Sequence, residues 1–377
     1  MTLELSDLGL ADLPRGARVV AAMSGGVDSS VTALLLQRAG FAVVGVTMQL
    51  YDQSQPLSGS RTCCAGQDVR DARRVAETLG IPHYVVDYEA KFASSVIAPF
   101  VDSYARGETP VPCVLCNQTV KFRDLLGMAQ DLGAAALATG HYVERRAVGG
   151  AVELHRGREA ARDQSYFLFG TTREQLAFTR FPVGGLPKAE VRRLAAESGL
   201  LIADKPDSQD ICFVPSGRYA EVVERRRPEV RREGDIVHVD GRVLGRHSGV
   251  ASFTVGQRRG VGIGGAGEPL YVVAVDAARD RVVVGPRSAL ATATLTLRDI
   301  NWLGNEVMPT SLDVVVRIRS TMNPVAARIE TAGSGVTVRF AEPELGVAAG
   351  QGCVFYDGSR LLGGGWIAHA TPIALAA

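Results

Sequence analysis

The sequence has few cysteines for its length: six in 377 residues, at positions 63, 64, 113, 116, 212 and 353. That number is too small for a disulfide scaffold, which argues against a secreted, disulfide-built protein. The sequence also lacks an uncharged apolar run long enough to cross a bilayer. Its first 20 residues lack the basic start and apolar stretch of a secretory signal. We therefore expect a cytoplasmic protein with no membrane partner, whose cysteines serve in packing, metal binding or catalysis.

An excess of positive charge is also missing, because the formal net charge is only +1. Composition therefore gives no sign of a nucleic-acid partner, and any such surface must be a local patch on a balanced protein. Hydrophobic residues make up 46% of the chain and charged residues 21%, which is enough apolar material for stable cores. The length exceeds what one core usually serves, so two or three domains are expected.

The first half of the chain alternates between apolar runs and helical patterns. Buried strands are predicted at residues 18–23, 42–48, 83–87 and 135–139, and helices at 29–37, 68–79, 91–106 and 116–131. Strands that alternate with helices indicate a doubly wound parallel sheet, which binds ligands outside the carboxyl ends of its strands.

The pattern changes after about residue 215. Asp240-Gly241 lies between two alternating segments and predicts a hairpin, and residues 277–280 connect two further strands. Alternating segments also fill the last 70 or so residues. We expect an α/β domain over residues 1–215, a central β-rich domain over 216–286 and a C-terminal β-barrel over 287–377.

A glycine-rich turn, Ser24-Gly25-Gly26-Val27-Asp28-Ser29-Ser30, joins the first predicted strand to the first helix. It has neither the Rossmann nor the Walker spacing. Its glycines let backbone N–H groups approach an anion, and the helix dipole and three hydroxyls add to the attraction. Asp28 would repel phosphate unless a divalent ion lay between them, so we predict Mg²⁺ there. The string resembles the loop of the PP-loop (adenine nucleotide alpha hydrolase-like) ATP pyrophosphatases, which implies cleavage of ATP to AMP and pyrophosphate.

Cys113 and Cys116 lie three residues apart at the start of a predicted helix, where the helix dipole favours a thiolate, and Cys212 follows in the string DSQDICF. A zinc ribbon would need a second pair of this kind. Inert buried cysteines and an iron–sulfur site made by all three remain alternatives to redox or sulfur-transfer chemistry.

Eight strings together resemble the bacterial tRNA-specific 2-thiouridylases and their mitochondrial relatives over nearly the whole chain. They are AMSGGVDSS (22–30), CCAG (63–66), CVLCNQTVKF (113–122), ATGHY (138–142), RDQSYFL (162–168), DSQDICF (207–213), FTVGQRRGVGI (253–263) and VFYDGSRLLGGGWI (354–367).

The resemblance implies roles for individual residues. The ATP site would consist of Ala22, Met23, Ser24, Gly25, Gly26, Val27, Asp28, Ser29, Met48 and Gly140. Cys116 takes the place of the nucleophile, and Cys212 that of the cysteine that carries a persulfide. Contacts with tRNA would come from Val111, Pro112, Cys113, His141, Arg162, Asp163, Gln164, Arg319, Ser320 and Gln351.

Two departures from the family pattern concern this site. Some members have Asp where this chain has Cys113, so the general acid or base stays unassigned. Many members read Asn-Pro where this chain has Val111-Pro112, which puts one contact with the target base in doubt.

The function implied is ATP-dependent 2-thiolation of the wobble uridine in the tRNA anticodon loop. The C2 carbonyl oxygen would be adenylated, and a cysteine persulfide would supply the sulfur. The persulfide either attacks the base directly or releases hydrosulfide first. A cysteine desulfurase or sulfur-relay protein would be the donor, and we expect a monomer in which Cys212 lies on a mobile segment. The alternatives are a PP-loop ligase that forms amides or guanidines, and a non-catalytic iron–sulfur RNA-binding protein.

Overall fold

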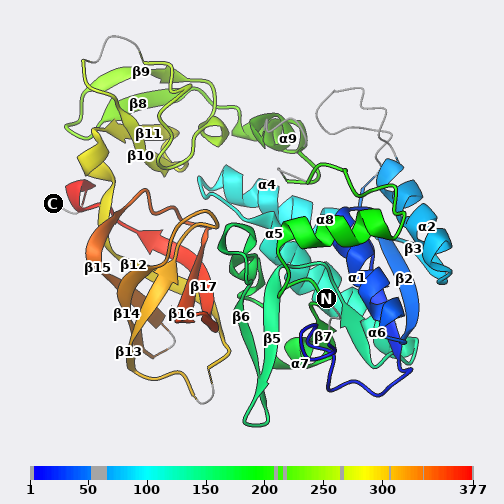
Figure 1. Ribbon diagram of the computed structural model, residues 1–377. Coiled ribbons are helices and arrows are strands. Elements are labelled where there is room, and N and C mark those ends of the chain that lie inside the picture. The colour runs from blue at the N-terminus through cyan, green and yellow to red at the C-terminus, as the bar shows by residue number, and fades with distance from the viewer. Residues whose placement is uncertain are drawn as a thin grey trace. The chain divides into compact units, whose positions relative to one another are not determined.

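The computed structural model describes residues 4–51, 66–207, 211–214, 219–263, 267–304, 307–333 and 335–375. The chain divides into two compact units, each made of separate stretches of sequence. Unit 1 comprises Met1–Ser95, Cys113–Phe213 and Ser359–Leu361, and unit 2 comprises Val96–Pro112, Val214–Gly358 and Leu362–Ala377. Figure 1 labels the elements of both.

Unit 1 is built around a five-stranded parallel sheet in the order β3-β2-β1-β4-β7. Its strands are β1 (Arg18–Ala22), β2 (Ala42–Gln49), β3 (His83–Asp87), β4 (Ala136–Ala138) and β7 (Thr179–Arg180). The four strands predicted from apolar runs are confirmed, because β1 to β4 lie within a residue or so of the expected positions. β7, only two residues long, was missed.

Helices cover this sheet. They are α1 (Val27–Arg38), α2 (Gln67–Leu79), α3 (Glu89–Phe92), α5 (Pro112–Leu115), α6 (Leu126–Asp131), α7 (Arg173–Phe178) and α8 (Lys188–Glu197). α1 contacts β1, β2, α2 and α8, and its Val31 and Leu36 are fully buried in the core beneath the sheet. The alternation of strand and helix thus gives the doubly wound α/β arrangement that was predicted.

Two helical segments depart from regular α geometry. Between α5 and α6 the chain forms a ten-residue π-helix, η2 (Cys116–Leu125), and a second π segment, η1 (Ala93–Ile97), lies between α3 and α4 (Ala98–Ala105). π segments of this kind often occur at functional sites. Cys116 is the first residue of the longer one.

An antiparallel hairpin in unit 1 was not predicted. β5 (Val143–Val148) pairs with β6 (Ala151–Arg156), and β6 pairs in turn with Arg360 and Leu361 at the start of β17. The hairpin follows directly after the segment 138–142, so it fixes the backbone that leaves the carboxyl end of β4.

Unit 2 contains a four-stranded sheet in the order β10-β11-β8-β9. β8 (Gly234–His238) and β9 (Val243–His247) form the hairpin predicted at Asp240-Gly241, and β10 (Tyr271–Asp276) and β11 (Arg281–Gly285) form the second predicted hairpin. β8 and β11 pair in parallel. The helix α9 (Tyr219–Arg226) precedes this sheet and contacts α4.

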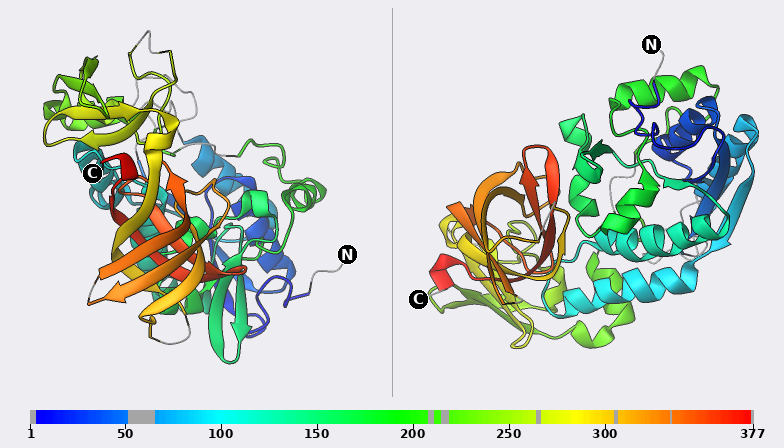
Figure 2. Two further views of the ribbon diagram at one scale, coloured as in Figure 1. Left: turned by 90° about the vertical axis from the view of Figure 1, so that its left-hand side faces the viewer. Right: turned by 90° about the horizontal axis from the view of Figure 1, so that it is seen from below.

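Six further strands of unit 2 close into a barrel, as predicted. They are β12 (Ala291–Trp302), β13 (Ser311–Arg317), β14 (Val325–Ala332), β15 (Gly335–Leu345), β16 (Gly352–Asp357) and β17 (Arg360–Ala370). Their order is β12-β15-β14-β13-β16-β17, and a pairing of β12 with β17 closes the ring. Figure 2 shows these curved strands in yellow to red. Trp366 is buried and Trp302 packs against the barrel core. The sequence pattern did not predict β12.

Candidate functional site

The phosphate loop joins the carboxyl end of β1 to the first turn of α1. Gly25 has a positive φ of 75°, and a Cβ there would lie 2.1 Å from the backbone oxygen of Asp68, so only glycine fits. Gly26 caps α1 without any side-chain hydrogen bond to the first-turn N–H groups. These N–H groups point out of a twelve-residue helix and suit an anion.

The serines of the loop turn inward. The Ser29 hydroxyl accepts a hydrogen bond from the Ser24 N–H at 3.1 Å and donates to the Gly26 carbonyl at 3.1 Å. Ser30 donates to the same carbonyl at 2.8 Å. The hydroxyls therefore stabilise the shape of the loop, and backbone N–H groups are the main donors left for a ligand.

Gly140 lies against the phosphate loop from the neighbouring strand. A Cβ at this position would lie 2.7 Å from the backbone nitrogen of Ser29 and 2.8 Å from the carbonyl carbon of Asp28. Met48 lies near the carboxyl end of β2, on the other side of β1, and is half-buried. Met48 and Gly140 therefore come from β2 and from just after β4, the two strands on either side of β1, while Ala22 and Met23 lie at the end of β1 and directly after it.

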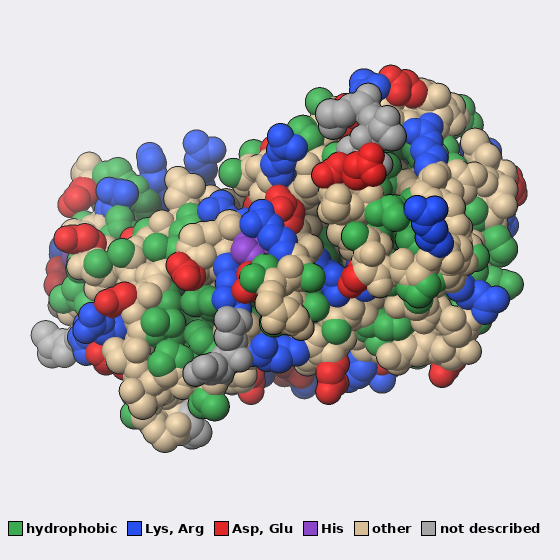
Figure 3. Space-filling view, turned by 60° about the horizontal axis from the view of Figure 1, so that its bottom comes forward, with side chains coloured by type: hydrophobic (Ala, Val, Ile, Leu, Met, Phe, Trp, Pro, Cys, Tyr) green, Lys and Arg blue, Asp and Glu red, His purple; other side chains and the backbone are tan. Residues whose placement is uncertain are grey.

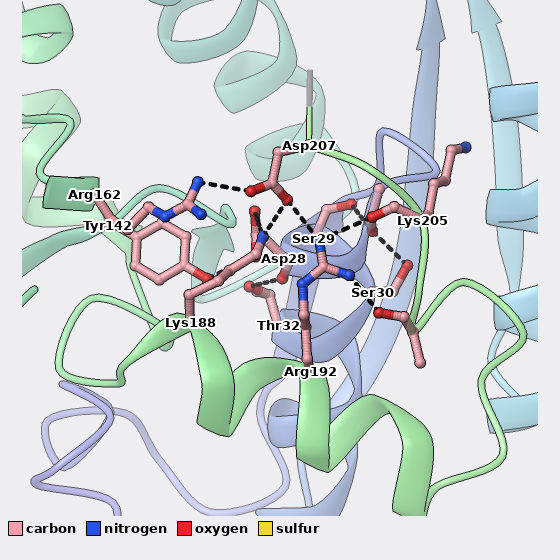
Figure 4. Close-up of polar contacts among 12 residues, drawn as sticks. Asp28, Ser29, Ser30, Thr32, Tyr142, Arg162, Lys188, Arg192, Lys205 and Asp207 are labelled. Carbon is pink, nitrogen blue, oxygen red and sulfur yellow. Dashed lines mark hydrogen bonds and ion pairs between the residues drawn. The ribbon is translucent and has the colours of Figure 1, made fainter. Parts of the chain in front are cut away.

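A network of charges surrounds Asp28 (Figure 4). The Nζ of Lys188 lies 2.7 and 2.9 Å from the two carboxylate oxygens of Asp28, and 2.7 Å from an oxygen of Asp207. Lys188 is 7% exposed, so this ammonium group has left bulk water. It comes from the first turn of α8 and bridges the phosphate loop to the segment that leads to Cys212.

Two arginines and a tyrosine complete this network. Arg162 and Arg192 bind Asp207 at 2.6 and 3.1 Å. Burial by itself would raise the pKa of Asp207, but its ion pairs with these cations and Lys188 outweigh burial and lower the pKa. The Tyr142 hydroxyl donates to Asp28 at 2.7 Å, and burial followed by the nearby carboxylate raises the pKa of Tyr142.

Lys205 forms a second bridge to the loop. Its Nζ donates to the Gly25 carbonyl at 2.9 Å and binds Asp68 and Asp71 of α2 at 2.8 and 2.6 Å. Lys205 and Asp207 thus hold the start of the segment whose residues 208–210 lie outside the described chain. The predicted mobility of this segment stays a prediction.

Three thiols gather in unit 1. Cys113 and Cys212 are exposed, Cys116 is 8% exposed, and none of them forms a disulfide. Burial raises the pKa of Cys116, which the Lys121 charge partly offsets. Desolvation by its surroundings, with Cys116 and Cys113 nearby, raises the pKa of Cys212 to about 12 although the residue is exposed. The ring of Phe213 packs against that of Phe92, 5.8 Å between centroids, and anchors the chain directly after Cys212.

His141 lies in the segment that contacts the phosphate loop. It lies between Gly140 and Tyr142, which both contact the loop, and its ring packs against Phe122. Burial, followed by the charge of Lys121, lowers the pKa of His141 well below its ordinary value. The charge of Lys121 also acts to lower the pKa of Cys116 and of Cys212, against the larger effect of burial.

The other residues expected at the tRNA surface lie in different environments. The Asp163 carboxylate is buried and accepts hydrogen bonds from the Gly157 N–H and from the N–H and hydroxyl of Ser165, and Gln164 accepts one from the Tyr142 N–H. Asp163 and Gln164 therefore stabilise the backbone of the loop that contains them, next to the charged network around Asp28.

Unit 2 holds five of the expected contacts. Arg319 donates to the Leu345 carbonyl, the Ser320 carbonyl accepts from Arg317, and Gln351 donates to the Thr109 carbonyl at 2.8 Å. Val111 and Pro112 are buried, directly before Cys113. Cys63 and Cys64 lie outside the described residues, and Cys353 is fully buried in the barrel core.

The surface carries mixed charge. Over the face drawn in Figure 3, Lys and Arg side chains are interspersed with Asp and Glu, in keeping with the small net charge of the chain. Within the described ranges, no group of three or more His, Cys, Asp or Glu side chains is arranged to hold a metal ion. No helix in the described part of the chain is long and apolar enough to cross a membrane.

Three family models match the chain in succession. They are the tRNA methyl transferase HUP domain at residues 17–216, the tRNA methyl transferase PRC-barrel domain at 221–286 and the aminomethyltransferase beta-barrel domain at 292–367.

Curated relatives match over almost their whole length. A protein of Parvibaculum lavamentivorans named tRNA-specific 2-thiouridylase MnmA is 59% identical over 373 residues, covering 96% of this chain and 94% of the relative. Proteins with the same name from Rhodospirillum centenum and Caulobacter vibrioides are each 57% identical, over 374 and 370 residues. They cover 97% and 95% of this chain, and 95% and 96% of the relatives.

Solved structures resemble a smaller share of the chain. The U34-tRNA thiolase NcsA from Methanococcus maripaludis has a TM-score of 0.36 at 17% identity, covering 59% of this chain and 72% of that one. A 4-thiouridine synthetase in complex with RNA and ATP has a TM-score of 0.36 at 21% identity, covering 57% and 51%.

Proposed function

This chain belongs to the tRNA-specific 2-thiouridylase family, and from that premise we propose how its own residues thiolate a tRNA uridine. The enzyme is a tRNA sulfurtransferase that uses ATP. The finer proposal is that the substrate is the wobble uridine, that the C2 oxygen is adenylated, and that sulfur arrives as a persulfide on Cys212. The observation that carries it is that the phosphate loop and the three thiols belong to one compact unit, in which Gly140 and Tyr142 contact the loop.

The first step needs an anion site. The first-turn N–H groups of α1 bind the phosphates of ATP, and Gly140 lets the neighbouring backbone come close enough to shape the site. Displacing a carbonyl oxygen by sulfur is unfavourable because that oxygen is a poor leaving group. Transfer of AMP to the oxygen, with release of pyrophosphate, converts it into a good one.

Asp28 is the residue of this site that could bind Mg²⁺. It is a carboxylate in the phosphate loop. Among the residues that the structure describes, its Oδ2 accepts a hydrogen bond from Lys188 alone, so lone pairs remain for a cation. Mg²⁺ usually binds through one or two carboxylates together with phosphates and water. Asp28 would hold a Mg²⁺ that arrives with ATP, and that ion would offset charge on the departing pyrophosphate.

The second step uses the thiols. The terminal sulfur of a Cys212 persulfide forms a bond to the activated carbon and AMP leaves. Cys116 then attacks the Cys212 sulfur, forming a disulfide and leaving the transferred sulfur on the base. In the other order Cys116 attacks first and releases hydrosulfide beside the base. Lys121 favours the thiolate at both cysteines.

The decisive experiment analyses nucleosides from unmodified tRNA by mass spectrometry. The tRNA is incubated with Mg-ATP, a persulfide donor and either wild type, Cys116→Ser or Cys212→Ser, with Cys353→Ala as a matched control from the barrel core. We expect 2-thiouridine with wild type and the control, and none with the two serine variants. Thiolation that persists in both serine variants would contradict the two-cysteine route. ATP consumption by wild type without sulfur in RNA would contradict the tRNA substrate.

We also propose that the chain has three domains, with boundaries at residues 215 and 286. The matched family models begin and end near these boundaries, which supports the division.

We further propose that the protein is a monomer in the cytoplasm and that it receives sulfur from a cysteine desulfurase or a sulfur-relay protein. Light scattering on the purified protein tests the monomer against its mass of 40.0 kDa.

A further inference from the structure

A short arm with two prolines connects α4 to α5, the helix in which Cys113 lies. Residues 108–111 form neither helix nor strand, and α5 begins at Pro112. Pro110 and Pro112 have fixed φ angles, and each favours an extended conformation in the residue before it. The arm, residues 109–112, is therefore stiff. A shift of its first residue, Thr109, is passed on to Cys113 and is not absorbed by the chain between them.

The turn between β15 and β16 holds Thr109 by both of its backbone polar groups. The Thr109 N–H donates to the Ala349 carbonyl at 2.8 Å, and the Thr109 carbonyl accepts a hydrogen bond from Nε2 of Gln351, also at 2.8 Å. The backbone of Gln351 is fixed in turn, because its carbonyl accepts from the Ile367 N–H of β17 at 2.8 Å. Gln351 thus connects the barrel strands to the arm.

Two glycines bring the start of the arm into close contact with the β-strands of unit 2. Gly350 has a φ of 86°, and a Cβ there would lie 2.9 Å from the Glu108 Cβ and 3.1 Å from the Thr109 nitrogen. Gly107 packs in the same way on β10, where a Cβ would lie 3.0 Å from Cγ1 of Val275. Hydrogen bonds and close packing therefore both fix the position of the arm.

This arrangement suggests a role for Gln351 other than the tRNA contact that the resemblance implies. Its side-chain amide donates to the protein backbone within unit 2. The arm that it holds leads to Val111, Pro112 and Cys113, the three residues expected beside the target base. Loss of one such hydrogen bond costs about 0.5–1.5 kcal/mol, and here the effect would fall on the position of the arm.

We propose that Gln351 is a positioning residue. Together with Gly350 it holds Thr109, and through the stiff arm it sets where Val111, Pro112 and Cys113 meet the target uridine. This inference rests on the proposed function, which places the uridine there. A misplacement of about 1 Å far from the chemistry can slow a reaction about 10²-fold. The rate of thiolation should therefore depend on Gln351 more strongly than the affinity for tRNA does.

The test separates rate from affinity. Single-turnover thiolation is measured at saturating tRNA with Mg-ATP and a persulfide donor, and the Kd for tRNA is measured by filter binding. Gln351→Met keeps the length of the side chain but removes the N–H donor. It should lower the rate at saturation at least about tenfold and change the Kd less than about twofold. Gln351→Lys keeps a donor of similar reach and should recover most of the rate.

A second variant perturbs the same turn through the backbone. The methyl group of Gly350→Ala would displace Glu108 and Thr109, so this variant should also lose rate and keep its Kd for tRNA. The affinity for Mg-ATP, a property of unit 1, should match wild type in every variant. Arg328→Met removes an exposed barrel cation whose partner, Asp313, also lies at the surface, and it should leave all three measurements unchanged.

The outcomes separate the two proposals. If Gln351→Met weakens tRNA binding at least tenfold but thiolates at the wild-type rate at saturation, Gln351 contacts the RNA and the positioning role is wrong. The role is also wrong if neither Gln351→Met nor Gly350→Ala slows thiolation, or if both lose affinity for Mg-ATP together with the rate. In each of these cases wild type still makes 2-thiouridine and the proposed function stands. If wild type makes none, the proposed function itself fails.

Discussion

Replacing Lys188 with Met removes the ammonium that joins Asp28 to Asp207 and keeps most of the apolar stem. Breaking a buried ion pair by removing one partner costs about 3–5 kcal/mol. Here the cost is smaller, because the Asp28 side chain is 30% exposed and Asp207 keeps Arg162 and Arg192. We expect a loss of about 2 kcal/mol, which corresponds to a fall in Tm of about 4–8 °C for a unit of this size.

The same variant should bind ATP more weakly. Without Lys188, the Asp28 carboxylate has only the Mg²⁺ of the ligand to offset its charge, and it repels the phosphate charge that this ion leaves uncompensated. A charge-assisted hydrogen bond contributes about 1.5–3 kcal/mol, so the Kd for Mg-ATP should rise at least about tenfold. Calorimetric titration measures the affinity and differential scanning fluorimetry the Tm.

Two variants make this experiment specific. Lys188→Arg keeps the charge and should recover most of the affinity. Arg193→Met removes a cation from the same helix whose partners, Glu190 and Glu197, lie at the surface, and it should leave both measurements unchanged. If Lys188→Met binds Mg-ATP as tightly as wild type, Lys188 does not offset the charge of Asp28 at the nucleotide site.

Four further variants test the same unit. Gly140→Ala places a methyl group 2.7 Å from a backbone nitrogen of α1 and should abolish measurable ATP binding. Gly127→Ala, in open space on α6, should instead stabilise the fold by about 0.5–1 kcal/mol in urea unfolding. Folding lowers the pKa of Asp207, so its carboxylate stabilises the folded state at pH values above its ordinary pKa of 3.8. This stabilisation is lost as the pH falls through the lower pKa of the folded state. The difference in stability between wild type and Asp207→Asn should therefore shrink below about pH 4. Phe213→Ala removes the ring that anchors Cys212 and should reduce thiolation more than pyrophosphate release, and an equal loss of both would contradict that anchoring role.

Local sequence signals were enough to predict the strands that carry the phosphate loop in unit 1 and a hairpin in unit 2. β1 to β4 are short apolar runs next to glycine turns, and the hairpin at Asp240-Gly241 depends on a two-residue turn. β7 is not predicted from the sequence because two residues are too few to show a periodic pattern. β12 contains alternating Thr and Leu residues, but it is not predicted because no turn signal marks where it begins.

The charged network could not be predicted in this way. Lys188 and Arg192 belong to an amphipathic helix whose sequence looks like that of many surface helices, and only the packing of α8 beside α1 brings Lys188 to Asp28. The sequence does show that acidic and basic residues occur in these segments. It does not show which of them form ion pairs in the folded protein. Resemblance identified Arg162 for a role toward tRNA, whereas its ion pair with Asp207 depends on tertiary structure.

The structure also changes the argument about Asp28. The sequence predicts a divalent ion between Asp28 and phosphate, because the carboxylate would otherwise repel it. The fold supplies a protein cation in the same place, because Lys188 contacts both Asp28 oxygens. Repulsion by Asp28 therefore does not by itself demand Mg²⁺. We propose Mg²⁺ at this site instead because ATP brings, and pyrophosphate carries away, more negative charge than a single ammonium shared with Asp207 offsets.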